Sequence, residues 1–291
     1  MINTVIHLPQ TDVTGLSESW LFKHCGEMHW DRLCEAIGVD GVNSEKMRDE
    51  SGKRLYPTFV AIRGRYAQPL CAVQMDQHFH TLVKLNHFGR AFFRSEVKFQ
   101  NRKARFDLEM LTTFVARNKH GLNQLHQSLP TNDLKYHSEA LLETPQLLKL
   151  SQALRHGKIV QHELLGYCFS VTKPASSGSD LSEIYEPSPY TDYNGAGLLY
   201  FAAYPAIADT LERKLIARRR LVDTDRDWVW QASTIARDVF YYRNLDLGET
   251  LRATLKCFER SSEDFLLYTQ LARASDLASI ADVFTVKRFL P

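Results

Sequence analysis

The segment DYNGAGLLYF, residues 192–201, carries a short polar stretch with two glycines directly into an apolar run. This pattern predicts a turn followed by a long helix from Gly197 to about Arg218. The first amides of a helix point forward from its end, and the helix dipole favours negative charge there. The segment therefore predicts a site for an anion, or for an oxygen that becomes negative during a reaction.

The same order of elements is predicted twice along the chain. An extended segment at 163–171 and a loop rich in Ser, Pro and Gly at 173–189 precede this helix, and strands follow it at 233–242, 250–259, 264–274 and 279–289. In the first half, an extended segment at 5–8 precedes a helix at 17–37, and strands follow at 55–63, 79–86, 90–100 and 106–116. This order of elements, a strand followed by a long helix and then several antiparallel strands, is that of the hot-dog fold. We therefore expect an α+β double hot dog, with two antiparallel sheets each wrapped round a long central helix.

We expect a first hot-dog unit at 1–158 and a second at 159–291. The first unit includes a connector at 118–158, with a helix at 138–154. A connector of this length is expected to pack across the sheet, because long structureless loops are uncommon in compact domains.

Composition excludes several classes of protein. The chain has 291 residues, 44% of them hydrophobic and 24% charged, which is typical of a soluble globular protein. A net charge of +2 argues against a nucleic-acid partner. No apolar run has the length of a membrane span, and the N-terminal residues do not form an export signal. The five cysteines are scattered without a CxxC pair, so we expect reduced thiols and a cytoplasmic protein.

Several motifs resemble a known family. They are Leu8–Gln10, Gly15–Lys23, Cys25-Gly26, His29-Trp30, Arg54–Arg63, Ile280–Val283 and Lys287–Phe289. Together they resemble the leinamycin-pathway bifunctional acyltransferase/decarboxylase family of polyketide biosynthesis. The resemblance implies a double hot dog that decarboxylates methylmalonyl-CoA and leaves propionyl on the phosphopantetheine arm of an acyl carrier protein. It implies acyl-CoA and a carrier protein as partners, with no further cofactor.

The resemblance also assigns the catalytic residue to Tyr56, in the Leu-Tyr-Pro motif. Thr58 stands where the family has alanine, which predicts an altered substrate pocket. A phenol can donate a hydrogen bond to a carboxylate or carbonyl, or accept an acyl group if a neighbour activates it. Arg54, Arg63 and Arg65 are near in sequence and could hold a carboxylate. On residue type alone, the simpler interpretation of Tyr56 is a half-buried strand tyrosine, and the resemblance is what favours a catalytic role.

Decarboxylation of a malonyl-type thioester leaves an enolate, which needs donors aimed at its oxygen. Amides at 195–197 or 17–19 are candidates, and Asn194 could add a side-chain donor. Gly195 would let the thioester approach closely. Asp192 and Asn194 are equally interpretable as helix caps.

The remaining candidates have simple structural alternatives. Ser17 is a substrate contact or an N-cap, and Glu18 is a base or a first-turn acid. Arg218 and Arg219 either dock a carrier protein or CoA, or complement the end of the second helix. Tyr241 and Tyr242 line a second pocket or pack in the core. The loop at 173–189 is a lid or a mobile surface. His78 and His80 have no third ligand at suitable spacing, so we expect no metal.

Three functions remain open from the sequence. The first is the acyltransferase/decarboxylase activity. The second is a dehydratase or thioesterase. A dehydratase would need a histidine such as His7, His78 or His87, and a thioesterase an acid such as Asp192 or Glu18. The third is a non-catalytic partner that binds acyl carriers. A homodimer formed edge to edge is one candidate assembly.

Overall fold

The computed structural model describes residues 2–38, 47–117, 125–130, 137–171, 181–222 and 227–290. The longer helices are α1 (Glu18–Ala36), α2 (Gln146–Arg155) and α3 (Tyr204–Arg219). The shorter helical turns are Leu8–Gln10, Leu70–Ala72, η4 (Phe201–Ala203) and Trp228–Trp230. The strands are β1 (Ile2–Val5), β2 (Thr11–Asp12), β3 (Gly15–Leu16), β4 (Leu55–Tyr66), β5 (His78–Phe88), β6 (Phe92–Gln100), β7 (Arg105–Arg117), β8 (Leu125–Gln127), β9 (Glu139–Ala140), β10 (Gln161–Leu164), β11 (Tyr167–Ser170), β12 (Ser182–Tyr185), β13 (Ala232–Tyr241), β14 (Leu251–Arg260), β15 (Asp264–Arg273) and β16 (Ser279–Phe289).

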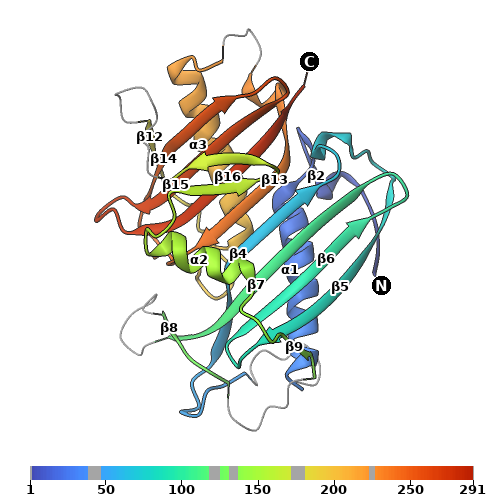
Figure 1. The fold of residues 1–291 in the computed structure, drawn as a ribbon, viewed down its shortest axis with the longest axis vertical. Helices are drawn as coiled ribbons and strands as arrows, with labels where there is room; N and C mark the ends of the chain where they lie inside the picture. The colour runs from blue at the N-terminus through green and yellow to red at the C-terminus, as the bar shows by residue number, and fades with distance from the viewer. Residues whose placement is uncertain are drawn as a thin grey trace.

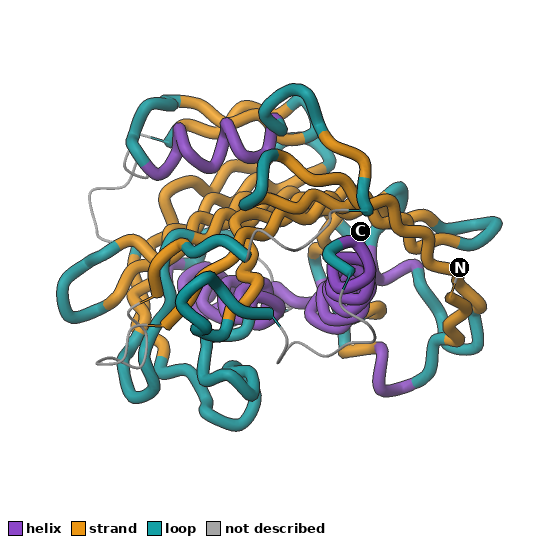
Figure 2. Tube along the Cα trace, turned by 90° about the horizontal axis from the view of Figure 1, so that it is seen from below, coloured by secondary structure: helices purple, strands orange, loops and turns teal. Residues whose placement is uncertain are grey.

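The chain is a double hot dog, as the order of its elements predicts (Figure 1). One sheet of 12 strands runs through both halves in the order β1-β5-β6-β7-β4-β13-β16-β15-β14-β12, with β8 and β9 added on β7 and β5. The two halves join where β4 pairs with β13. The sheet curves over α1 and α3 on one face, while α2 and the β10–β11 hairpin lie on the opposite face (Figure 2).

Helix α1 confirms the helix predicted at 17–37. Its N-cap is Ser17, whose Oγ accepts a hydrogen bond from the amide of Trp20 at 3.4 Å. The side chains of Leu21, Phe22 and Leu33 are fully buried against the strands of the first half. Burial of these side chains, each worth about 1.5–3 kcal/mol, holds the helix in the concave face.

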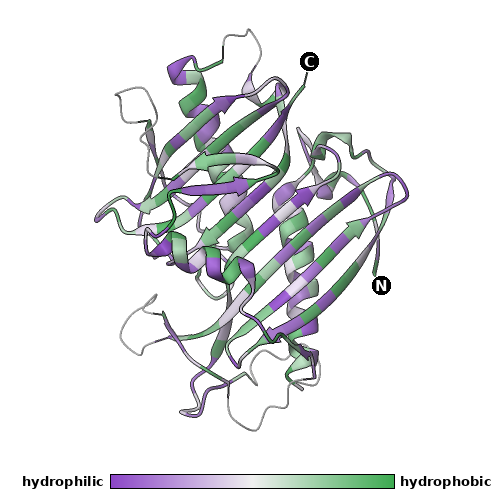
Figure 3. Cartoon of the chain, in the orientation of Figure 1, coloured by the Kyte–Doolittle hydropathy of each residue, from purple (hydrophilic) through white to green (hydrophobic). Residues whose placement is uncertain are grey.

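The long strands also match their prediction closely. In β6, Phe93, Ser95, Val97 and Phe99 are fully buried, and the residues that alternate with them are more exposed. This alternation is visible along β5, β6 and β7 (Figure 3). The four strands after α3 agree with their predicted positions to within one residue at each end.

Four sequence predictions of local structure outside residues 192–201 are wrong. The segment at 5–8 leaves the sheet, because β1 ends at Val5. The strand predicted at 163–171 is a hairpin, because Leu165 and Gly166 adopt positive φ angles of 54° and 77° and turn the chain. The connector helix covers only Gln146–Arg155. The predicted loop at 173–189 contains β12, while its residues 173–180 lie outside the described ones.

A buried ionic network ties α1, α3 and the sheet together. Arg237 on β13 is fully buried and donates to Glu18 on α1 at 2.8 Å and to Asp209 on α3 at 2.9 Å. Lys287 on β16 also pairs with Asp209, at 2.6 Å. Burial raises the pKa of Asp209, but Arg237 and Lys287 outweigh it and lower that pKa to about 2. The two halves are therefore held together by charge pairs as well as by apolar packing.

No helix among the described residues combines the length and apolarity needed to cross a membrane.

Candidate functional site

A cavity of about 880 Å³ opens at the junction of the two halves. This volume is in the range of cavities that hold small-molecule ligands. Its walls come from α1, β4 and its neighbours, α2, the segment before α3, and the chain around the end of β13. The lining residues are Gly26, Glu27, Trp30, Pro57–Val60, Phe92, Thr113, Val115, Leu125, Gln127, Leu148, Ser151, Gln152, Arg155, Asn194, Leu198–Phe201, Tyr204, Tyr241–Asn244 and Arg273.

The cavity lies where the pairing between the two halves stops. β4 pairs with β13 only from Ala61 to Arg65, although β4 begins at Leu55. A proline lacks the N–H of a central ladder position, so Pro57 suits a stretch with a paired strand on one side only. The register of β4 against β7 also shifts between Phe59 and Ala61, as at a β-bulge. Bulges are common next to active sites because they redirect side chains.

Residues 192–201 form one wall of the cavity, but not as the start of a helix. The predicted start at Gly197 is wrong, because α3 begins at Tyr204. Gly197 has a positive φ of 67°, and an isolated bridge pairs Tyr193 with Leu199. The segment is therefore a tight turn. Pro205, in the first turn of α3, suits a helix start because its missing N–H would have no intrahelical partner there.

Asn194 organises this turn and lines the cavity. Its Oδ1 accepts the amides of Ala196 at 3.0 Å and Leu198 at 3.1 Å. Since both bonds need the carbonyl oxygen, the remaining polar group of the side chain is the Nδ2 donor. The turn is fixed to the chain that follows β13 by Asn244, whose Oδ1 accepts the amide of Leu199 at 2.9 Å.

Glu27 on α1 is the one carboxylate among the described residues that line the cavity. Its side of α1 contacts the segment before α3. Burial, together with the Glu27 charge, raises the pKa of Tyr200. Lys23 lies 5.7 Å from the centroid of the Tyr200 ring. A single carboxylate therefore lies on the wall of a cavity that is also lined by aromatic rings, hydroxyl groups and arginines.

Gly26 allows α1 to approach this segment closely. A Cβ added at Gly26 would overlap Cζ of Phe201. The Phe201 ring is also held by Phe59 of β4, with the two ring centroids 4.0 Å apart. The contact brings α1, β4 and the chain before α3 together at one point of the cavity wall.

Gly26→Ala is expected to destabilise the protein. Overpacking against the Phe201 ring costs about 1–3 kcal/mol, more than the gain of up to about 1 kcal/mol from the helix propensity of alanine. Urea denaturation should show a lower free energy of unfolding. Gly195→Ala is the matched control, because a Cβ there meets no atom within 4 Å. Equal stability of the two variants would contradict this account of the cavity wall.

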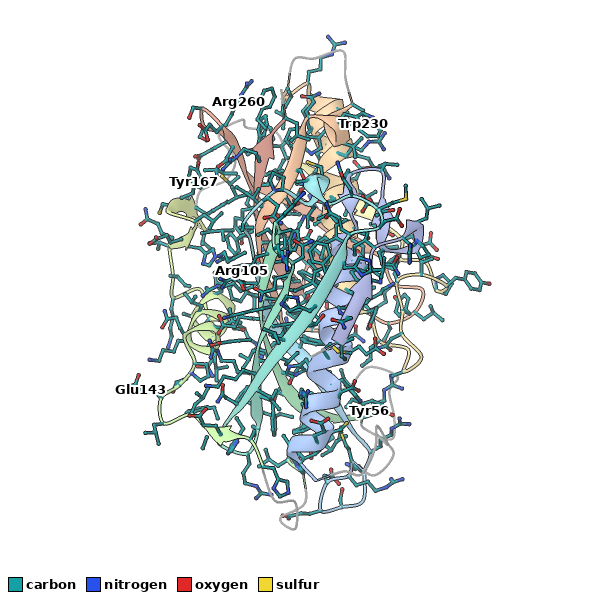
Figure 4. The ribbon with its side chains drawn as sticks, turned by 90° about the vertical axis from the view of Figure 1, so that its right-hand side faces the viewer. Tyr56, Arg105, Glu143, Tyr167, Trp230 and Arg260 are labelled. Atoms are coloured by element: carbon teal, nitrogen blue, oxygen red, sulfur yellow. The ribbon has the colours of Figure 1, made fainter. Side chains whose placement is uncertain are left out.

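The predicted site residues are only partly brought together. Thr58 and Asn194 line the cavity, whereas Gly195 is exposed beside it and Tyr56 is outside its lining. Tyr56 lies at the end of the molecule where β4 begins (Figure 4). Its ring lies between the guanidinium carbons of Arg54 and Arg117, at 5.2 and 5.4 Å from the ring centroid.

Arg117 also donates to the carbonyl of Ala196 and so connects the Tyr56 end of β7 to the 192–201 turn. Arg63 and Arg65 lie farther along β4 and pair with the buried Asp238. They are therefore occupied by a structural carboxylate, away from Tyr56.

The predicted acids make structural contacts away from the cavity lining. Glu18 pairs with Arg237 and accepts a hydrogen bond from the Tyr66 hydroxyl at 2.7 Å. Asp192 accepts hydrogen bonds from the Tyr185 hydroxyl and the amide of Ser188, both at 2.8 Å. These contacts fix the start of α1 and the base of the 192–201 turn.

The arginines and histidines considered from the sequence also lie outside the cavity lining. Arg218 pairs with Glu183 at 2.6 Å, and Arg219 is exposed. His7, His78 and His87 are not among the lining residues. Within the described ranges, no group of three or more His, Cys, Asp or Glu residues is placed to hold a metal.

Tyr241 and Tyr242 line this same cavity and not a second one. The Tyr241 hydroxyl donates to the carbonyl of Phe201 at 3.0 Å, and the Tyr242 hydroxyl donates to Asp282 at 2.8 Å. The end of β13 is therefore tied to the segment before α3 on one face of the sheet and to β16 on the other.

Sequence reasoning missed Glu27 and Asn244. Glu27 follows the Cys25-Gly26 pair, and a glycine inside a predicted helix often marks a close approach of another segment. That signal could have directed attention to the residues beside Gly26. Asn244 follows a predicted strand without any pattern that would single it out.

The fold and its cavity define a double-hot-dog protein with a ligand-sized site between its halves. Neither a protein-family model nor a curated protein matches the chain in sequence. A Lactobacillus plantarum structure provisionally described as an oleoyl thioesterase is similar over 100% of this chain and 95% of its own, with TM-score 0.67 and 12% identity. The 12:0-ACP thioesterase of Umbellularia californica matches 99% of this chain and 96% of its own, with TM-score 0.62 and 10% identity.

An acyl-ACP thioesterase of Bacteroides thetaiotaomicron is also similar, over 98% of this chain and 96% of its own, with TM-score 0.57 and 10% identity. At such low identity these likenesses establish the fold of the whole chain and leave its chemistry to be argued from the site.

Proposed function

We propose that this protein hydrolyses acyl thioesters in the cavity between its two halves, with Glu27 as the general base. The observation that carries the proposal is a single carboxylate on the wall of a ligand-sized cavity that Asn194, with its Oδ1 already bonded in the turn, also lines. The described lining contains no cysteine and no histidine, which favours a carboxylate and water over a thiol nucleophile. The three structures that share the fold and are described as thioesterases support the same reaction class.

The proposed reaction needs one base and one donor. Glu27 accepts a proton from a water molecule, whose oxygen attacks the thioester carbonyl carbon. The carbonyl electron pair moves to oxygen, and Nδ2 of Asn194 stabilises the resulting oxyanion. Collapse breaks the carbon–sulfur bond, and the proton held by Glu27 goes to the departing sulfur. The products are a carboxylic acid and a free thiol.

The thiol carrier in this proposal is CoA or the phosphopantetheine arm of a carrier protein. Arg243 lines the cavity, is exposed, and forms no ion pair within the described part of the chain. An arginine in this position can bind the phosphate that both carriers share. Glu27 is exposed as well, so the thioester can enter from solvent on this side.

A second candidate is the decarboxylation and acyl transfer implied by the leinamycin-pathway resemblance. The placement of Tyr56 between two guanidinium groups favours it, because a malonyl-type carboxylate could bind beside the phenol. Hydrolysis is preferred because Tyr56 is not among the residues that line the cavity.

One assay separates these functions. The protein is incubated with acyl-CoA or methylmalonyl-CoA, with and without a phosphopantetheinylated carrier protein. Free thiol is measured, together with the intact mass of the carrier. Thiol and free acid without a carrier mass change support hydrolysis. A propionyl mass on the carrier supports acyl transfer with decarboxylation, and absence of both reactions supports a binding role.

Asn194→Asp is expected to lower kcat while leaving the fold intact. The carboxylate keeps both acceptor bonds to Ala196 and Leu198, but it replaces the Nδ2 donor with a negative oxygen. Loss of one oxyanion donor typically lowers the rate by roughly 10²–10³-fold. Thermal unfolding should show a Tm near that of the wild type. A variant that keeps full activity would remove Asn194 from the mechanism.

A further inference from the structure

The cavity has walls on both faces of the sheet. Glu27, Trp30 and Phe201 belong to the face that carries α1 and α3. Leu148 and Ser151 belong to α2, which lies on the opposite face (Figure 2). A single cavity with walls on both faces must pass through the sheet or around its edge.

The passage is the stretch of β4 that pairs with β7 but not with β13. Pro57 to Val60 run past the end of β13, and the residues that follow β13 line the same cavity. The bulge in β4 helps to make both faces accessible here. Phe59 packs against Phe201 on the α1 side, whereas Val60 packs with the cluster that includes Leu148 of α2.

Four α2 residues line the cavity, of which Gln152 and Arg155 are exposed and Leu148 and Ser151 are buried. The part of the cavity beneath α2 is suited to an apolar group. Val60 and Phe92 on the sheet and Leu148 on α2 provide apolar surface. Ser151 on α2 is only 4% exposed, so it lies beneath the helix and not on its outer surface. We call this part, walled by Val60, Phe92, Leu148 and Ser151, the α2 chamber.

We propose that the α2 chamber binds the distal part of the acyl group. The acyl chain passes from the thioester, held beside Glu27, through the gap between β4 and the end of β13. The carrier arm stays on the α1 side, where Glu27 is exposed. The substrate class is therefore a medium or long acyl chain rather than acetyl or propionyl. This inference rests on the proposed site for the thioester.

Binding of non-hydrolysable S-alkyl-CoA thioethers tests the α2 chamber without any turnover. Val60→Phe and Ser151→Phe each fill the chamber, one from the sheet and one from α2. Both variants should weaken binding of S-decyl-CoA by roughly tenfold or more, since steric changes of about one methylene are worth 10–200-fold. Binding of S-ethyl-CoA should be unchanged, which also shows that each variant is folded.

The matched control is Lys149→Phe, on the same helix but exposed and outside the cavity lining. It should leave the Kd of both thioethers unchanged. If both chamber variants weaken the two thioethers equally, the chamber holds the carrier arm and the proposal is overturned. Unchanged binding of S-decyl-CoA would also overturn it. Hydrolysis is measured in a separate assay. Absence of hydrolysis would therefore contradict the proposed function, whereas the binding results alone test the α2 chamber.

Discussion

Replacing Glu27 with glutamine is expected to abolish most thioester hydrolysis. Glutamine keeps the size and hydrogen-bonding capacity of the side chain but cannot accept the proton of the attacking water. General bases typically contribute 10²–10⁴-fold, so kcat should fall by roughly that factor. Release of free CoA from an acyl-CoA, followed with a thiol reagent, measures this loss. KM should change little, because the acyl chain and the carrier arm keep their contacts.

Glu35→Gln provides the control on the same helix. Glu35 is exposed, pairs with Arg32 at 2.6 Å and does not line the cavity. Its replacement should leave kcat unchanged and alter stability by less than about 1 kcal/mol, as for surface ion pairs. If Glu27→Gln hydrolyses thioesters as fast as Glu35→Gln does, Glu27 is not the base.

The regular elements were predictable because their causes are local. The N-cap at Ser17 and the apolar stripe beyond it determine α1 within a few turns of chain. In β6 the alternation of Phe93, Val97 and Phe99 reports burial of one face directly. The repeated order of helix and strands, together with the family resemblance, then predicted the double hot dog, because few architectures accommodate that order.

The errors arose where a few side chains override a pattern. The apolar run after Gly197 does not start a helix, because Asn194 binds two amides of the turn and delays α3 to Tyr204. Leu165, a residue that rarely adopts positive φ, turns the β10–β11 hairpin with Gly166. Neither result could be derived from hydrophobic periodicity.

The cavity itself could not be predicted, because no local pattern contains it. It depends on where β13 stops against β4, which is a register between residues about 180 positions apart in the chain. Pro57 indicates that this part of β4 has a partner strand on one side only. It does not indicate which strand stops short on the other side. The sequence did place Thr58 and Asn194 among the candidates, and both line the cavity. Their roles, and that of Tyr56, stay predictions until variants are assayed.

The largest effect on stability is expected from Arg237→Met. The substitution removes a fully buried cation that pairs with Glu18 and, together with Lys287, with Asp209. Breaking a buried ion pair from one side typically costs about 3–5 kcal/mol, because the remaining charge stays uncompensated. Guanidinium denaturation should show this loss in the free energy of unfolding. Arg219→Met, on an exposed arginine, should change that energy by less than about 0.5 kcal/mol.

The pH dependence of Arg237→Met identifies the charge responsible. Burial raises the pKa of Glu18, and Arg237 opposes that rise in the wild type. Without Arg237 the folded-state pKa rises further, so folding must keep Glu18 protonated while the unfolded chain ionises. The stability loss should therefore be larger at pH 8 than at pH 5. Adding Glu18→Gln to this variant should recover part of the stability loss at pH 8. If the loss is independent of pH and is not recovered, its cause is the lost packing of the arginine stem and not the charge of Glu18.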